Sequence, residues 1–279
     1  MRTNNPVFSR PNAFAPGQQS QDGFRADYTW SPQRGGQLPG QGGYPPMAAD
    51  RSVSLQGRMS IEDVITKTAV LLLALVGAGG FTWFLMPRNL LLPVAAVGSL
   101  VAFFTVMVVS ARRNVPVAGV IAYAVVEGVV IGGWSRLLEA LYPGIVMQAV
   151  LGTIVAAAMV LAAYRFLGAR VRGRLAQIVT LSIMGYAVMA LISFVLYFAN
   201  VNIGWSAMGP GAGPLAWLSA GVGVVLATAS LLMDFDSIEQ GVRMGAPEQE
   251  SWRGAFGLIV TLIWLYTLLL RILSFFRSE

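Results

Sequence analysis

Residues 116–138 read PVAGVIAYAVVEGVVIGGWSRLL, an apolar run with a single acidic residue, Glu127, near its middle. In a helix that rises 1.5 Å per residue, about 20 residues cross the roughly 30 Å hydrocarbon core of a bilayer. This run is therefore predicted to be a transmembrane helix. Glu127 should lie roughly 18 Å along it, close to the midplane of the membrane.

Six further apolar runs of similar length fill the chain after residue 62. They predict additional spans over residues 64–86, 90–110, 145–164, 175–198, 215–236 and 253–276. Turn-forming stretches rich in Pro, Gly and Asn separate the runs. We therefore expect an all-α, polytopic membrane protein with seven transmembrane helices, made of one domain over residues 59–279.

Residues 1–58 differ from the rest because they are polar and rich in Gly, Pro and Gln. A segment of this composition buries too little apolar surface to offset its ordering entropy, so it is predicted to be a disordered tail. Arginines are concentrated in this tail and in alternate loops. By the positive-inside rule, the N-terminus is predicted to be cytoplasmic and the C-terminus to lie outside.

Composition excludes several classes of protein. The chain has no cysteine and no histidine, which rules out disulfides, Cys/His zinc sites and Ser–His hydrolysis. Only oxygen ligands remain for a metal, and these favour cations such as calcium. The net charge of +6 is interpreted as a topology signal and a contact with anionic lipid, not as nucleic-acid binding. No enzyme motif is found, and no cofactor is expected beyond a calcium ion.

Three carboxylates lie in or at the edge of the predicted spans: Glu127, Asp234 and Asp236. Acidic side chains are costly near lipid, so these three are functional-site candidates. Tyr123 lies one turn before Glu127 on the same face and is predicted to hydrogen-bond to it. Two interpretations of Glu127 stay open: a protonated tie between helices, or a group that handles protons or cations.

Asp234 and Asp236 cannot both face the same interior, because residues two apart on a helix point about 200° apart. Asp236 shares its side with Gln240 and Arg243 and is predicted to be solvated. Asp234 shares its side with small residues, including Gly223, and is predicted to point inward. In an alternative interpretation, both are boundary residues at the end of the span.

Other charged and small residues give predictions about packing. Arg271, near the end of the last span, is expected to snorkel to the interface or to pair with an acid. Arg136 and Glu139 are three residues apart and are predicted to form a surface ion pair. A third prediction concerns the small residues beside Glu127, which should let a neighbouring helix approach closely: Gly128, Gly132 and Gly133.

Three elements taken together resemble the Bax inhibitor family of transmembrane proteins, and more narrowly its actinobacterial-type members. They are Tyr123-Ala-Val-Val-Glu127-Gly128, Asp234-Phe-Asp-Ser-Ile238 and Leu268-Leu-Leu-Arg271-Ile272. The resemblance covers about residues 59–279. It implies a seven-helix bundle with the seventh helix at the centre, and a pH-sensitive calcium leak. It also implies roles in restraining cell death or membrane proteolysis.

The resemblance further implies a pH sensor made of two aspartates, on spans six and seven, that share a proton. Asp234 matches the first aspartate. The second should lie ten residues before Arg271, where this chain has Thr261. A lone aspartate cannot form a like-charge pair. Either Glu127 or Asp236 replaces the missing partner, or this branch does not gate by pH.

The leading hypothesis from sequence is a cation leak channel in a bacterial plasma membrane, with calcium as the ion. Asp234 would act as a gate or calcium ligand, and Glu127 as a buried proton or cation ligand. Two alternatives remain. One is a non-conducting protein that binds a membrane protease or another membrane protein in a stress or cell-death response. The other is a proton-coupled transporter of a small solute.

Overall fold

The computed structural model describes residues 57–112, 115–201 and 203–277, so the predicted tail lies almost wholly outside the described residues. Within that part of the chain there are seven helices and no strand. They are α2 (Ile61–Leu85), α3 (Arg88–Ala111), α4 (Val117–Leu141), α5 (Ile145–Phe166), α6 (Arg174–Phe198), α7 (Pro214–Arg243) and α8 (Glu250–Phe275). All seven are long and apolar enough to cross a membrane, which confirms the prediction of seven spans.

α7 is the helix whose bounds differ most from the prediction. It continues to Arg243, seven residues beyond the expected end at 236. These last two turns carry charged and polar side chains, and the ion pairs described below compensate their charges. Hydropathy marks where a helix leaves the apolar layer, whereas the helix itself ends only at the turn around Gly245, which has a φ of 65°.

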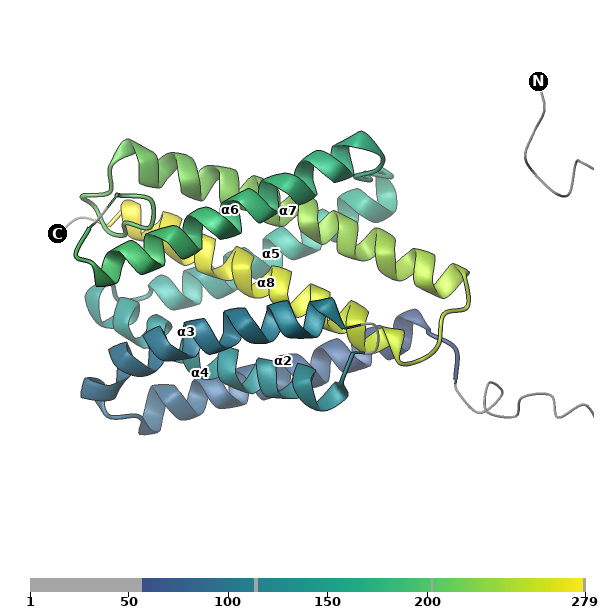
Figure 1. The fold of residues 1–279 in the computed structure, drawn as a ribbon, viewed down its shortest axis with the longest axis horizontal. Helices are drawn as coiled ribbons and strands as arrows, with labels where there is room; N and C mark the ends of the chain where they lie inside the picture. Colours follow the sequence, from purple (N-terminus) through teal and green to yellow (C-terminus); the bar gives the residue numbers. More distant parts are fainter. Residues whose placement is uncertain (1–56, 113–114, 202, 278–279) are drawn as a thin grey trace, which may run out of the picture. The chain divides into compact units, whose positions relative to one another are not determined.

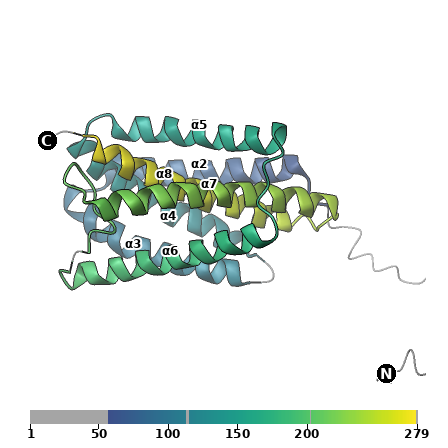
Figure 2. The same ribbon diagram turned by 90° about the horizontal axis from the view of Figure 1, so that it is seen from above.

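The last helix, α8, occupies the centre of the bundle. It contacts α2, α4, α5 and α7, and a larger share of it is buried than of any other described helix. Figures 1 and 2 show α8, in yellow, running among the other helices. α6 is the opposite case, because among the described helices its backbone comes close only to that of α7, although its Tyr186 side chain reaches Trp264 of α8. The predicted central position of the seventh span is confirmed.

Glycines allow α2 and α4 to pack with their backbones almost touching. A Cβ atom built on Gly132 would lie 2.5 Å from the carbonyl oxygen of Gly79, and one on Gly128 would overlap the carbonyl oxygen of Leu75. The predicted close approach is confirmed at these two positions. Gly133 faces α3 instead, where a Cβ would meet Ala95 at an ordinary distance of 3.7 Å.

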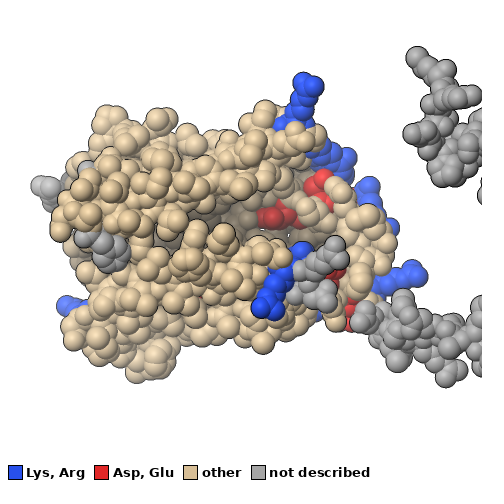
Figure 3. Space-filling view, in the orientation of Figure 1, with Lys and Arg blue, Asp and Glu red and all other residues tan. Residues whose placement is uncertain are grey.

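Charged side chains gather at one end of the bundle (Figure 3). The seven antiparallel helices bring the start of α2 and the α3–α4, α5–α6 and α7–α8 loops to the same end. We call this the charged end, and its basic residues include Arg112, Arg170, Arg172, Arg243 and Arg253. Figure 3 also shows that the face between the upper and lower helices is hollowed, with acidic side chains inside the hollow.

Candidate functional site

Asp234 on α7 is bound to the central helix by a hydroxyl group. Thr261 of α8 donates a hydrogen bond from Oγ1 to Asp234 Oδ2 at 2.7 Å. The hydroxyl of Ser230, one turn before Asp234 on α7, lies 3.4 Å from the Thr261 hydroxyl. Gly257, one turn before Thr261, leaves space beside the carboxylate, since a Cβ there would lie 3.3 Å from Asp234 Oδ1. The predicted inward position of Asp234 is confirmed.

A cavity of about 650 Å³ surrounds Asp234 and reaches toward the charged end. Its wall comes from α3, α7 and α8 and includes polar groups from the ends of these helices. Among them are Ser230, Ser237, Gln240, Glu250 and Arg253. A charged carboxylate in such a cavity can attract a cation from the side of the charged end.

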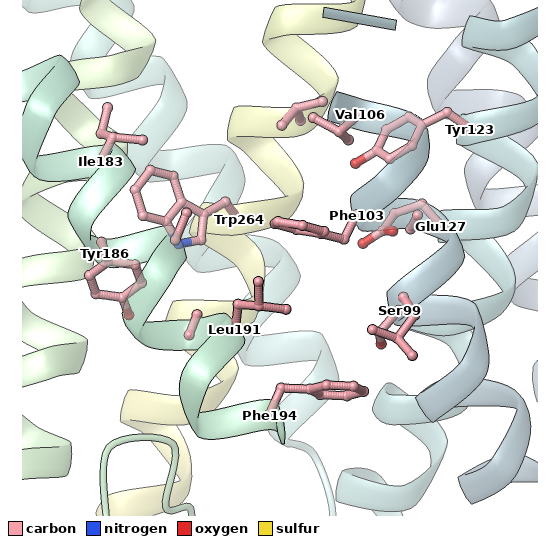
Figure 4. A pocket seen from close by; sticks show the side chains of 15 residues that line it. Ser99, Phe103, Val106, Tyr123, Glu127, Ile183, Tyr186, Leu191, Phe194 and Trp264 are labelled. Atoms are coloured by element: carbon pink, nitrogen blue, oxygen red, sulfur yellow. The ribbon is translucent and has the colours of Figure 1, made fainter. Parts of the chain in front are cut away.

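Glu127 lines a second cavity, of about 450 Å³, between α3, α4, α6 and α8. No described residue forms a hydrogen bond or ion pair with its carboxylate. The predicted hydrogen bond from Tyr123 is wrong, because the Tyr123 ring packs edge-on against Phe256 of α8 with centroids 5.2 Å apart. Both oxygen-bearing groups point into the cavity, as Figure 4 shows.

The two cavities adjoin each other. Val106 of α3 and Val260 of α8 belong to the walls of both. These two apolar side chains therefore lie between the Asp234 cavity and the Glu127 cavity. Together the cavities extend from the charged end to the interior of the bundle.

Asp236 has a different environment from Asp234, and the prediction that it is solvated is wrong. Its side chain is 7% exposed. Arg172 binds both of its oxygens, with Nε 3.2 Å from Oδ2 and a terminal nitrogen 2.6 Å from Oδ1. Arg170 and Gln240 add bonds at 3.3 and 2.6 Å. Hydrogen bonding to Asp236 raises the pKa of the Arg172 guanidinium, which stays charged.

The ion pairs around Asp236 continue to Glu239, one turn later on α7. Glu239 accepts from Arg170, Arg243 and the Tyr164 hydroxyl. This cluster fastens the α5–α6 loop to the end of α7 and is a structural clamp. Sequence reasoning missed it, although two arginines spaced by one residue in a short loop were a usable signal.

Arg271 neither snorkels nor pairs with an acid. Its guanidinium is buried at the end of the bundle opposite the charged end, where it donates to the carbonyl oxygens of Trp205 and Ala207 and to the Ser219 hydroxyl. Backbone carbonyls satisfy it in place of a carboxylate. Arg271 therefore fastens the α6–α7 loop across α8 at that end.

Arg136 and Glu139 do not pair with each other. Arg136 donates to the carbonyl oxygens of Thr82 and Met86 at the end of α2. Glu139 accepts from the backbone nitrogens of Gly144 and Val146, at the start of α5. Arg136 thus lies at the negative, C-terminal end of one helix dipole and Glu139 at the positive, N-terminal end of another. These contacts replace a surface ion pair, which would add little stability.

The described residues contain no group of three or more acidic side chains that could hold a metal ion. Calcium in a tight site takes six to eight oxygen ligands. Asp234 offers its carboxylate and the nearby hydroxyls of Ser230 and Thr261. These oxygens are fewer than a tight calcium site requires.

Comparison of the sequence with known protein families identifies the family of this chain. The family model described as Bax inhibitor 1 like matches residues 5–278, nearly the whole chain. This protein belongs to the Bax inhibitor 1 like family. No curated protein sequence matches the chain significantly. The family match begins at residue 5, so it extends into the segment that the motif resemblance had left out.

In this Bax inhibitor 1 like protein, the two positions that the resemblance identified as a sensor pair do meet. They are Asp234 and Thr261, which share a hydrogen bond. The pair contains one titratable group instead of two. Asp236, two residues after Asp234, is bound to two arginines.

Proposed function

We propose that this protein is a pH-modulated cation leak in a bacterial plasma membrane, with calcium as its principal ion. The observation that carries the proposal is the pair of adjoining cavities, each with one carboxylate, that extend from the charged end into the bundle. The positive-inside rule supports a cytoplasmic position for the charged end. The conducting route would pass Asp234, then the side chains of Val106 and Val260, which line both cavities, and then Glu127.

Asp234 is proposed as the gate. In the structure its hydrogen bond from Thr261 holds α7 against the central helix, while Arg271 fastens the α6–α7 loop over the opposite end. We assign this arrangement to the closed state. A hydrogen bond to a charged carboxylate is stronger than one to a neutral group. Protonating Asp234 therefore weakens the closed state, and flux should rise as pH falls.

The small number of oxygen ligands around Asp234 is consistent with an ion that binds weakly and passes slowly. A tightly bound ion would not leave, and conduction requires binding that is weak enough to release. One carboxylate and two hydroxyls near Asp234 meet that requirement. Glu127, near the middle of α4, would then supply a second weak station at depth.

Calcium flux into proteoliposomes tests the proposal. Glu127→Gln removes the inner charge and should lower flux about tenfold or more, because a lone charge acts strongly where water is scarce. Glu62→Gln is the matched control: it removes the same charge from an exposed position at the start of α2 and should leave flux unchanged. Equal flux in both variants would count against a route past Glu127.

Absence of flux from the unmodified protein would favour the non-conducting alternative. Deleting residues 1–58 then discriminates further. An interaction protein that uses this segment should lose its partner in a pull-down, whereas a leak should keep its flux. The deletion keeps Met59, which is 5% exposed, and with it the packing of Met59 against Val64 and Ile238.

A further inference from the structure

The cavity around Glu127 combines a single carboxylate with several aromatic rings. The rings come from four helices and belong to Phe103, Tyr123, Tyr186, Phe194 and Trp264. Tyr186 and Trp264 pack together, with centroids 5.5 Å apart and planes tilted by 55°. Figure 4 shows these two rings on the wall that faces Glu127. The volume of about 450 Å³ lies within the range that holds small organic molecules.

This combination attracts organic cations for two reasons. A carboxylate in a largely apolar cavity interacts strongly with a positive charge. Aromatic faces add a further attraction to ammonium-type groups, and that attraction grows when the cation loses its water. The Glu127 carboxylate has no described hydrogen-bond or ion-pair partner to satisfy it, so a ligand would not have to displace one.

The oxygen atoms of the cavity are too few to replace the water of a small inorganic ion. Apart from Glu127, the side-chain oxygens in its wall are those of Ser99, Tyr123 and Tyr186. An organic cation carries its charge inside hydrocarbon groups, is weakly hydrated and needs no ring of oxygens. Such an ion fits the apolar lining more tightly than an inorganic ion, which would pass Glu127 with part of its water still attached and bind only weakly.

Access to the cavity is from the side. α3 and α6 both contribute to its wall, but their backbones do not come close to each other in the part of the chain that the structure describes. The wall contributed by α6 includes the small residues Ala187 and Ala190. A molecule dissolved in the bilayer can therefore reach Glu127 between the two helices.

We infer that this cavity is a binding site for lipophilic organic cations of the quaternary ammonium or phosphonium class, with Glu127 as the counter-ion and the aromatic rings as the surrounding cage. The site goes beyond the proposed leak. It depends on the cavity alone and holds whether or not inorganic ions pass.

Binding of tetraphenylphosphonium to the purified full chain in detergent, followed by equilibrium dialysis, tests the inference without a flux assay. We expect saturable binding of one ion per chain, weakened at least about tenfold by Glu127→Gln and unchanged by Glu62→Gln. Tetraphenylborate has nearly the same shape and the opposite charge, so it should bind far more weakly. Similar affinities for the two probes would show hydrophobic partitioning and overturn the site.

A second variant keeps the test decisive if Glu127→Gln fails to fold. Ala190→Phe adds a bulky ring to the α6 wall and leaves the carboxylate in place. It should also weaken tetraphenylphosphonium binding about tenfold or more, with a melting temperature close to that of the unmodified protein. Unmodified binding in Ala190→Phe, or no saturable binding to the unmodified chain, would overturn the proposal.

Discussion

Asp234 and Asp236 lie two residues apart on one helix, yet the protein treats them in opposite ways. Asp234 faces the central helix and receives a hydrogen bond from one hydroxyl, inside a cavity. Asp236 faces the α5–α6 loop and is bound by two arginines and a glutamine. The compensated acid holds the structure together. Among the described residues no cation pairs with Asp234, and this is why we propose Asp234 as the acid that responds to protons or cations.

The largest effect should come from removing the compensated acid. Asp236→Ala leaves Arg170 and Arg172 without their shared carboxylate and should lower the free energy of unfolding by about 3 kcal/mol, at the low end for buried pairs because Arg172 is half exposed. A fall of several degrees in melting temperature in detergent would show this. A stability within error of the unmodified protein would show that the clamp contributes nothing.

Thr261→Asp sharpens the comparison by giving Asp234 a like-charged neighbour. The two carboxylates would lie within hydrogen-bond distance and could not both ionise without cost. Relative to the unmodified protein, we expect the variant to lose about 2 kcal/mol at pH 8 and much less at pH 6, where one proton is shared. Melting temperatures at the two pH values measure the difference. Equal losses at both would show that the two side chains do not interact.

Thr261→Val keeps the shape of the side chain and removes its hydroxyl donor. The Asp234 carboxylate then loses its bond to α8, which should cost about 1 kcal/mol of stability and raise calcium flux at pH 8 toward the value at pH 6. Flux at pH 8 in proteoliposomes is the readout. Thr267→Val serves as the control, because the Thr267 hydroxyl donates only to the Trp264 carbonyl within α8.

The smallest effect is expected from Arg172→Gln. The Arg172 side chain is 53% exposed, and Arg170 and Gln240 remain to bind Asp236. Solvent screens an exposed ion pair, so the melting temperature should fall far less than in Asp236→Ala. If the two variants were equally unstable, the clamp would depend on Arg172 alone.

The sequence predicted the helices because the bilayer demands uninterrupted apolar runs, and hydropathy records those directly. It also selected Glu127 and Asp234, since acids inside such runs are rare. The meeting of Asp234 with Thr261 came from the family resemblance, not from spacing. These predictions depend on the pattern of residues along the chain or on a family resemblance. None of them requires knowing how the loops run in space.

The failures share one cause: each depends on a side chain or loop from another part of the chain. Asp236 was placed in solvent because a helical wheel cannot show that the α5–α6 loop brings Arg170 and Arg172 onto that face. Tyr123 was assigned to Glu127 by its spacing, but packing against Phe256 decides the position of its ring. Long side chains reach partners that periodicity does not reveal.

We propose that Asp234, and not Asp236, makes the protein's cation leak respond to pH. Calcium flux into proteoliposomes at pH 6 and pH 8, measured for the unmodified protein and for Asp234→Asn, tests it most directly. We predict higher flux at pH 6 in the unmodified protein, and flux that is high at both pH values in Asp234→Asn, because asparagine imitates the protonated acid. A pH response that survives unchanged in Asp234→Asn would contradict the account.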